Sequence, residues 1–203
     1  MRFKCRFDRE RGLPLILMGF VIVLDQVTKS IVAARWYIGA HIWPEPAHWD
    51  DLLQIIHVRN TAIAFSIGQN LPDPAKRILF VILPVIVLCI LVWYYLSSDE
   101  FTRLQRWATA GILGGGIGNI ADRIMRPDGV VDFISVKLPE WFVWDRWPTF
   151  NVADASVVVS CFLLLVTIFM GSRKAITATA VTEEEPSETV AMSAGEGPDE
   201  QET

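Results

Sequence analysis

The sequence has little of the chemistry that most hydrolases and metal sites use. Its 203 residues include only three cysteines and three histidines: Cys5, Cys89, Cys161, His41, His48 and His57. The cysteines are far apart and show neither disulfide nor metal-ligand spacing, and the histidines all fall in one stretch. There is no GxSxG elbow for a nucleophilic serine and no HExxH zinc motif. We therefore expect no metal and no cofactor, and carboxylates remain as the candidate catalytic groups.

An excess of charge of one sign is also lacking, except at the C-terminal end. The formal net charge is −5, but eight acidic residues and no basic ones lie between Glu183 and Thr203. The rest of the chain has 18 basic residues against 15 acidic ones. Residues 175–203 are poor in apolar side chains and rich in Thr, Ser, Gly and Pro, which is typical of disordered segments. We expect a disordered acidic cytoplasmic tail there, and no nucleic-acid partner.

Apolar residues, in contrast, are abundant and make up 52% of the chain. Four runs are long enough to cross a bilayer, which takes about 20 apolar residues. They are about 12–34, 78–96, 107–125 and 152–171. The first continues past Asp25 with no small-residue cleavage site after it, which favours a retained span over a signal peptide. We predict a basic N-terminus over residues 1–11 and a four-helix transmembrane domain over 12–174.

Lysine and arginine next to the spans predict their orientation. The N-terminal lead, the link 97–106 and the segment after the last span are short and basic, and such segments face the cytoplasm. Both termini are then cytoplasmic, and the links 35–77 and 126–150 lie outside. Six of the eight tryptophans fall in these outer links, as is typical of segments at the membrane interface. Within the links, 54–65 and 129–138 have the β-branched, partly alternating pattern of short strands.

Polar side chains interrupt the spans at one predicted depth. They are Asp25 and Lys29 in the first span, Asn119, Asp122 and Arg123 at the end of the third, Asp154 at the start of the fourth, and Asp132 in the adjoining outer link. An ionised group at the bilayer centre costs at least ~2.5–3.5 kcal/mol, so such residues persist where they face a protein interior or a polar cavity. Because successive spans alternate in direction, all these positions fall near the outer membrane boundary. The coincidence favours one functional cluster, although each group alone could be a structural ion pair, a polar helix contact or a cap.

Spacing along the helices indicates which of these groups are paired. Asp25 and Lys29 are four residues apart, share a helix face and can neutralise each other. Asn119, Asp122 and Arg123 also share a face, with Arg123 beside Asp122, and together offer an amide, a carboxylate and a guanidinium. The two remaining carboxylates of the cluster are therefore the least paired.

These two carboxylates, Asp132 and Asp154, are the candidates for chemistry. Asn151 lies three residues before Asp154 at a helix start, where asparagine can cap the helix. Two carboxyl groups at close range in a low-dielectric site cannot easily both ionise, so one keeps a proton. The ionised group can take a proton from water while the neutral one donates to a carbonyl, which is aspartyl peptide hydrolysis. Their separation of 22 residues gives this pairing only weak support by itself.

Five short motifs occur in a fixed order along the chain. They are DQVTK (25–29), RNTAIAFS (59–66), GGGIGNIADR (114–123), GVVDFI (129–134) and FNVADASV (150–157). In this order they resemble the lipoprotein signal peptidases of bacteria (signal peptidase II), integral-membrane aspartyl enzymes that remove signal peptides from prolipoproteins. The resemblance covers about residues 12–170. One departure is Ala62 and Ile63, where the family pattern NxGAAF has a glycine and a small residue.

The resemblance implies an all-α bundle of four transmembrane helices with a small extracytoplasmic β-cradle and an interfacial helix in the first outer link. It implies that Asp132 and Asp154 are the catalytic dyad and that Asn119 and Arg123 hold the substrate. The supporting polar residues would be Asp122, Asp25, Lys29, Asn60 and Asn151. The family's substrate is a diacylglyceryl-modified prolipoprotein, cut before the lipidated cysteine. We therefore expect a multi-pass protein of the bacterial inner membrane with its active site near the outer leaflet.

Two other classes of function fit parts of the pattern. Intramembrane aspartate and arginine also occur in ion-coupled transporters, but a carrier favours repeated halves and interrupted helices at the midplane. The sequence shows no repeat, and its charges lie at one boundary. A non-enzymatic membrane scaffold would use the glycine-rich third span for packing and would tolerate neutral residues in place of the aspartates. In every case we expect contacts with membrane lipids, and a monomer, because a four-helix unit with an internal site needs no second copy.

Overall fold

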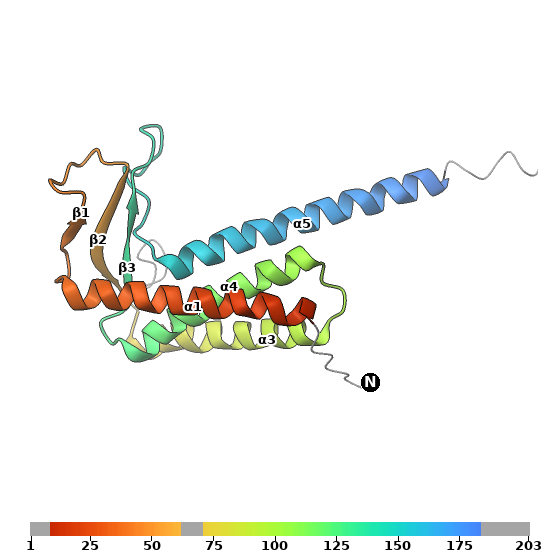
Figure 1. The fold of residues 1–203 in the computed structure, drawn as a ribbon, viewed down its shortest axis with the longest axis horizontal. Helices are drawn as coiled ribbons and strands as arrows, with labels where there is room; N and C mark the ends of the chain where they lie inside the picture. Colours follow the sequence, from red (N-terminus) through yellow and green to blue (C-terminus); the bar gives the residue numbers. More distant parts are fainter. Residues whose placement is uncertain (1–8, 62–70, 184–203) are drawn as a thin grey trace, which may run out of the picture. The chain divides into compact units, whose positions relative to one another are not determined.

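The computed structural model describes residues 9–61 and 71–183, with side chains described as far as Met170. The chain forms two compact units, Met1–Leu164 and Leu165–Thr203. In the first unit, three long helical segments run side by side, and a small sheet lies across one end of them (Figure 1). The described part of the second unit, 165–183, is the later part of helix α5 (Val152–Glu183).

The first and last predicted spans are both helical. Helix α1 covers Arg9–Arg35, three residues earlier and one later than predicted. Helix α5 covers Val152–Glu183 and continues well past the predicted end of the span. Residues 175–183, predicted to belong to the disordered tail, are therefore helical, and the predicted start of the tail is corrected. The helix can continue this far because the first proline after its start is Pro186. The remainder of the predicted tail, 184–203, lies outside the described residues.

The second predicted span is one continuous helix with a wider turn inside it. It consists of α2 (Asp73–Arg77), the π-helical turn η2 (Ile78–Ile82) and α3 (Leu83–Ser97). Pro84 sits in the first turn of α3 and has no backbone N–H to donate. A π-turn just before such a residue lets the helix continue without the usual bond.

The third predicted span is helix α4 (Arg103–Met125). A capping box starts it: the Gln105 backbone N–H donates to Thr102 Oγ1 at 3.3 Å, and the Thr102 N–H donates to Gln105 Oε1 at 2.9 Å. Among the described residues, three helices are long and apolar enough to cross a membrane, Arg9–Arg35, Asp73–Ser97 and Val152–Met170. Helix α4 is not among them, so a membrane-spanning role for it stays a prediction.

Helix α4 packs at the centre of the first unit because its glycines let neighbours approach. A Cβ on Gly115 would collide with the backbone carbonyl of Ala153 and would lie 2.8 Å from a methyl carbon of Val157, both in α5. A Cβ on Gly118 would lie 2.6 Å from the Asp25 carboxylate of α1. Both contacts are closer than side chains tolerate, so this packing requires glycine at the two positions.

Three antiparallel strands form the sheet, in the order β1 (His41–Trp43), β2 (Leu53–Asn60) and β3 (Val130–Val136). The two strands predicted in the outer links are thus present, although β2 ends at Asn60 and residues 62–65 of its predicted length lie outside the described residues. Strand β1 was not predicted. In the link 35–77, residues 36–61 contain no helix and residues 62–70 lie outside the described residues. Its last residues, 73–77, form α2, which continues into the second predicted span, so a separate interfacial helix stays a prediction.

A small apolar core joins the sheet to the end of α1. Val32 of α1 packs with Val131 and Phe133 of β3, and all three side chains are buried. Because Asp132 lies between the two β3 residues, burial of its neighbours on both sides fixes the backbone that carries it. This core brings the third strand against the helices.

Candidate active site

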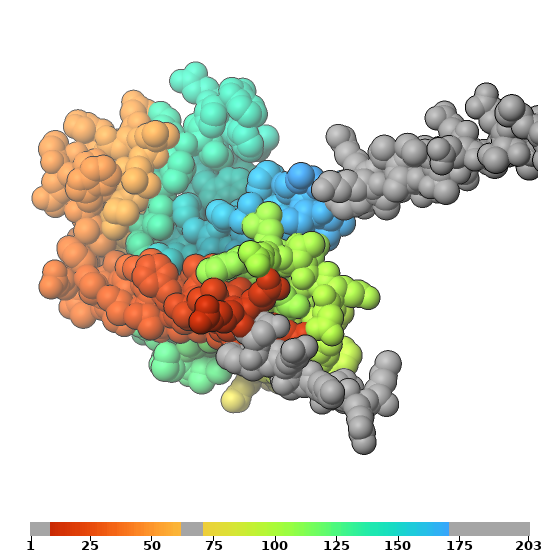
Figure 2. Space-filling view, turned by 45° about the vertical axis from the view of Figure 1, so that its right-hand side comes forward, coloured from red at the N-terminus to blue at the C-terminus, as the bar shows by residue number. Residues whose placement is uncertain are grey.

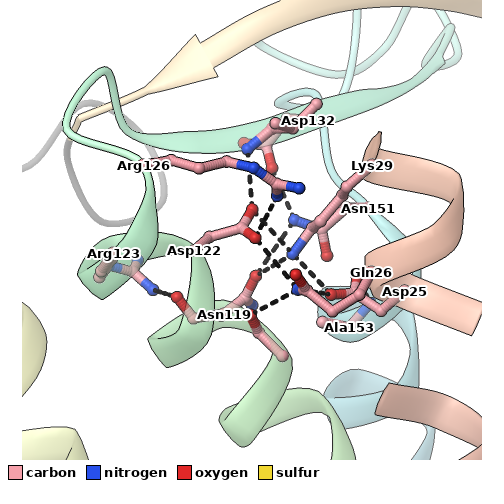
Figure 3. A network of polar contacts seen from close by, with 12 residues as sticks. Asp25, Gln26, Lys29, Asn119, Asp122, Arg123, Arg126, Asp132, Asn151 and Ala153 are labelled. Carbon is pink, nitrogen blue, oxygen red and sulfur yellow. Dashed lines mark hydrogen bonds and ion pairs between the residues drawn. The ribbon is translucent and has the colours of Figure 1, made fainter. Parts of the chain in front are cut away.

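The predicted polar residues meet in one network where the sheet crosses the ends of the helices (Figure 3). They come from α1, α4, β2, β3 and the first turn of α5, and include Asp25, Lys29, Asn60, Asn119, Asp122, Arg123, Asp132, Asn151 and Asp154. Five separate stretches of sequence therefore contribute to one site.

Asp132 is held by two asparagine side chains. It lies on β3 opposite Val58 of β2, so Asn60, two residues further along β2, is its diagonal neighbour. Asn60 Nδ2 donates to Asp132 Oδ2 at 2.9 Å, and Asn151 Nδ2 donates to Oδ1 at 2.7 Å. Asp132 is only 2% exposed. Burial, and then the nearby charge of Asp154, raise the pKa of Asp132 to about 6.

Asp154 is positioned by the capping box that starts α5. The backbone N–H of Asp154 donates to Asn151 Oδ1 at 3.0 Å, and the backbone N–H of Asn151 donates to Asp154 Oδ2 at 3.2 Å. The predicted cap at Asn151 is thus confirmed. The other carboxylate oxygen, Oδ1, accepts a hydrogen bond from Asn119 Nδ2 at 2.7 Å. Unlike Asp132, Asp154 is partly exposed.

Asn151 links the two carboxylates through a single side chain. Its amide nitrogen donates to Asp132, while its amide oxygen accepts from the backbone of Asp154. The amide nitrogen also lies 3.2 Å from Asn119 Oδ1, which ties the link to α4. A buried carboxyl with a raised pKa beside a second, more accessible carboxylate is an arrangement that can hold one proton between two groups.

Lys29 neutralises two buried carboxylates beside this pair. Its Nζ lies 2.8 Å from Asp25 Oδ2 and 3.3 Å from Asp122 Oδ2, and it donates to Asn119 Oδ1 at 2.9 Å. The other oxygen of Asp25 accepts the backbone N–H of Ala153 at 2.9 Å. The predicted pair of Asp25 and Lys29 is thus present, and it also fastens α1 to α4 and to the start of α5.

Asp122 and Arg123 have different surroundings, which corrects the single group predicted from their spacing. Asp122 is buried and forms ion pairs with Lys29 and Arg126. Arg123 forms no ion pair of this kind with the residues that the structure describes: it donates to the backbone carbonyl of Asn119 at 3.2 Å and lies within electrostatic range of three carboxylates, those of Asp154, Asp132 and Asp122. Adjacent helix residues point about 100° apart, so the two side chains separate.

Two further residues of the network, Gln26 and Arg126, were missed by the sequence analysis. Gln26 Nε2 lies 3.0 Å from each of three acceptors: Asp25 Oδ2, Asp122 Oδ1 and the Gly118 carbonyl. Arg126 pairs with Asp122 and donates to Ser30 Oγ at 3.0 Å. A signal for Arg126 was available, because it follows Asp122 by four residues on a helix.

A cavity of about 440 Å³ opens next to this network, although neither Asp132 nor Asp154 is among the residues that line it. Asn60 and Arg123 line it, so it reaches the groups that contact or face Asp132. The remaining lining residues are Thr61, Asp73, Lys76, Arg77, Phe80, Val81, Ile124, Arg126, Pro127 and Gly129. The charged residues in this lining are four cations and one carboxylate, Asp73. The lining also includes apolar side chains from η2 and α4, so the cavity suits a ligand with both polar and apolar parts.

Sequence comparisons match this chain to known proteins over most of its length. Residues 17–170 match the sequence model of a family described as signal peptidase (SPase) II. A lipoprotein signal peptidase of Treponema pallidum is 42% identical over 171 residues, which is 84% of this chain and 90% of the relative. Lipoprotein signal peptidases of Treponema denticola and Borreliella burgdorferi are 47% and 41% identical, over 72% and 77% of this chain and 82% and 89% of theirs.

Solved structures give the same answer for the fold. A bacterial membrane enzyme determined at 2.3 Å matches with a TM-score of 0.67 and 26% identity, covering 94% of this chain and 99% of that one. A second, determined at 1.9 Å, matches with a TM-score of 0.64 and 26% identity, covering 83% and 97%. The arrangement of apolar helices and a small antiparallel sheet is therefore that of a known membrane enzyme.

Proposed function

Since this chain belongs to the signal peptidase II family, we propose that Asp132 and Asp154 are the catalytic pair with which it cleaves its substrate. Its activity is that of a lipoprotein signal peptidase, the removal of signal peptides from prolipoproteins by an aspartic peptidase. The family assignment sets aside the transporter and scaffold alternatives. The proposed substrate is the diacylglyceryl-modified prolipoprotein, cut just before its lipidated cysteine.

The single observation that carries the proposal is the link through Asn151 between a buried and a more accessible carboxyl group. Asp132, with its raised pKa, holds the shared proton. Asp154, the more accessible of the two, is the proposed base, and hydrogen bonds from Asn119 and from the backbone N–H of Asn151 hold its carboxylate in place.

Hydrolysis then proceeds through one tetrahedral intermediate. Asp154 takes a proton from water as the water oxygen bonds to the scissile carbonyl carbon, and Asp132 gives its proton to the carbonyl oxygen. In the second step, the C–N bond breaks as Asp154 returns its proton to the leaving nitrogen. Asp132 recovers a proton from a hydroxyl of the intermediate. The products are a carboxylic acid and an amine, and the pair is again singly protonated.

The surrounding residues have proposed roles in holding the substrate or the pair. Arg123 lines the cavity and faces both carboxylates, so it can bind a carbonyl of the substrate backbone. Asn119 orients Asp154, and Asn60 orients Asp132. Asp25, Lys29 and Asp122 hold the helices that carry these groups.

The protein is a multi-pass membrane protein. We propose that α4 also crosses the membrane, as the third of four spans, that both termini are cytoplasmic, and that the active site lies near the outer leaflet of the inner membrane. The four-helix peptidase domain would cover residues 12–174. At this depth the acyl chains of the substrate can stay in the bilayer while its peptide enters the cavity, and a monomer is sufficient.

The proposal is tested by incubating the purified protein with a diacylglyceryl-modified prolipoprotein and measuring the mass of the fragments. The wild type should release a fragment that begins at the lipidated cysteine. Asp132→Asn and Asp154→Asn should each lower kcat/KM by about 10³-fold or more, because a proton can no longer be shared. Asp128→Asn, in the exposed turn before β3, is the matched control and should cleave like the wild type. Wild-type turnover by either dyad variant would rule the assignment out.

A further inference from the structure

The loop between β3 and α5 exposes apolar side chains that the proposed chemistry does not use. We call residues 139–147 the aromatic loop. Five of its side chains are large, apolar and exposed: Trp141, Phe142, Val143, Trp144 and Trp147. Trp141 is 80% exposed and Val143 is 94% exposed. Large apolar side chains exposed together in one short segment often mark a surface that meets a membrane or another molecule.

The aromatic loop is held firmly on the sheet by Arg146. The guanidinium donates to Ser135 Oγ at 2.8 Å and to the Ser135 carbonyl at 3.0 Å, both on β3. It also donates to the carbonyls of Asp51 at 3.0 Å and Trp49 at 3.2 Å, and it lies over the Trp49 ring. One half-buried side chain thus joins the loop, β3 and the segment before β2. These contacts fix the position of the aromatic loop on the sheet.

The chain length to the next helix limits where the aromatic loop can lie. Trp147 is five residues before Val152, the first residue of α5. Since an extended chain spans at most ~3.6 Å per residue, this end of the loop lies within about 18 Å of the start of that apolar helix. The strands run crosswise to α1, α3 and α4, so the loop extends sideways from the helices (Figure 1). In Figure 2 the same turquoise segment projects from the top of the molecule, beside the segment around β1 and β2.

We propose that the aromatic loop inserts its rings into the outer leaflet, at the boundary between lipid headgroups and acyl chains. Tryptophan favours this boundary, and the exposed carboxylates Glu140 and Asp145 of the loop can remain among the headgroups. Because Arg146 ties the loop to β3, the lipid contact anchors the strand that carries Asp132 at a fixed depth. The proposal rests on the transmembrane topology proposed above, and not on the roles of Asp132 and Asp154.

A fluorescent label at the tip of the loop tests this contact directly. In the full chain with its three cysteines replaced by alanine, Val143→Cys is labelled with bimane and the protein is placed in phosphatidylcholine–phosphatidylglycerol vesicles. Nitroxide-bearing lipids should quench the label, more strongly with the nitroxide near the headgroup than deep in the acyl chain. Dissolved iodide should quench it less than it quenches free bimane. Adding Trp141→Ser and Trp144→Ser should reduce the lipid quenching, since these rings hold the loop in the leaflet.

Two outcomes would overturn the proposal. Full quenching by iodide with none by nitroxide lipids would place the loop in water. Protection from both quenchers would mean that protein covers the loop, either a second copy or the bound prolipoprotein. Cleavage by the labelled protein is measured in parallel, so failure of the catalytic assignment would be seen separately from failure of the lipid contact.

Discussion

At the scale of single residues, the site depends on a buried lysine that several carboxylates share. Lys29 contacts Asp25 on its own helix and both Asp122 and Asn119 on α4. The side chain of Asn119 in turn donates a hydrogen bond to Asp154. A buried ion pair adds little net stability, but removing one partner leaves the other charge buried and unpaired. Lys29 therefore matters because two carboxylates would be left without it.

We predict that Lys29→Met lowers the free energy of unfolding by about 3–5 kcal/mol, because it leaves Asp25 and Asp122 short of a cation. Thermal unfolding in detergent measures the loss. The control is Arg103→Met, which breaks the exposed pair with Glu10 and should cost at most about 1 kcal/mol. Equal loss in the two variants would show that the buried network has no special role.

Residue spacing predicted contacts within a helix better than contacts between elements. The pair Asp25–Lys29 and the cap of Asn151 on α5 follow from positions along one helix, and both are present. The contact between Lys29 and Asp122 joins two helices, so it depends on how closely α1 and α4 pack. The triple contact of Gln26 has the same origin, and single-sequence spacing carries no signal for it.

At the scale of elements, α4 is the helix on which the others pack. Its glycines predicted a central position, and the close contacts of Gly115 with Ala153 and Val157 explain why. The same glycines, together with its polar residues, make α4 less apolar than the other spans. The glycines of α4 thus identify it as the central helix and also lower its hydropathy, which makes it harder to recognise as a membrane span.

We predict that Gly115→Ala lowers the free energy of unfolding by about 1–3 kcal/mol, because the added methyl group has no room against α5. Gly19→Ala in α1 is the matched control. Its Cβ would meet nothing within 4 Å, so the replacement should be neutral or stabilising by about 0.5–1 kcal/mol. Unfolding temperatures of both variants in one detergent check this, and an unchanged value for Gly115→Ala would mean that α4 and α5 do not pack as described.

The elements that the sequence did not predict are those with short or ambiguous patterns. Strand β1 has three residues, too few for an alternating pattern to be distinctive, and it forms because β2 offers it a partner. The π-turn η2 lies within a uniformly apolar run, where no periodicity marks it. Helix α5 continues to Glu183, although the low apolar content of residues 175–203 predicted disorder from residue 175. Low apolar content alone does not end a helix.

At the scale of the whole molecule, the proposed catalytic function belongs to the first compact unit. This unit ends at Leu164 and contains every residue of the proposed site. The second unit contributes none of the contacts that hold Asp132 and Asp154 among the described residues. Catalysis should therefore be independent of the segment that follows the last span.

We predict that a chain ending at Lys174 cleaves prolipoprotein with an unchanged kcat/KM. The assay is the fragment mass measurement described above, with membrane insertion of both proteins checked by extraction. Loss of cleavage by a truncated protein that still inserts and unfolds at the normal temperature would instead assign residues 175–203 a role in activity.

The central claim is that Asp132 and Asp154 share one proton, and infrared spectroscopy of the protein in lipid measures that proton directly. Because burial raises the pKa of Asp132 to about 6, its carboxyl is protonated below that pH and loses the proton as the pH rises through it. The carbonyl stretch of a protonated carboxyl should fade with a midpoint of about 6, and kcat/KM should fall over the same range. The band should be absent in Asp132→Asn and retained in Asp128→Asn. A titrating band that survives in Asp132→Asn, or a wild type without one, would contradict the account.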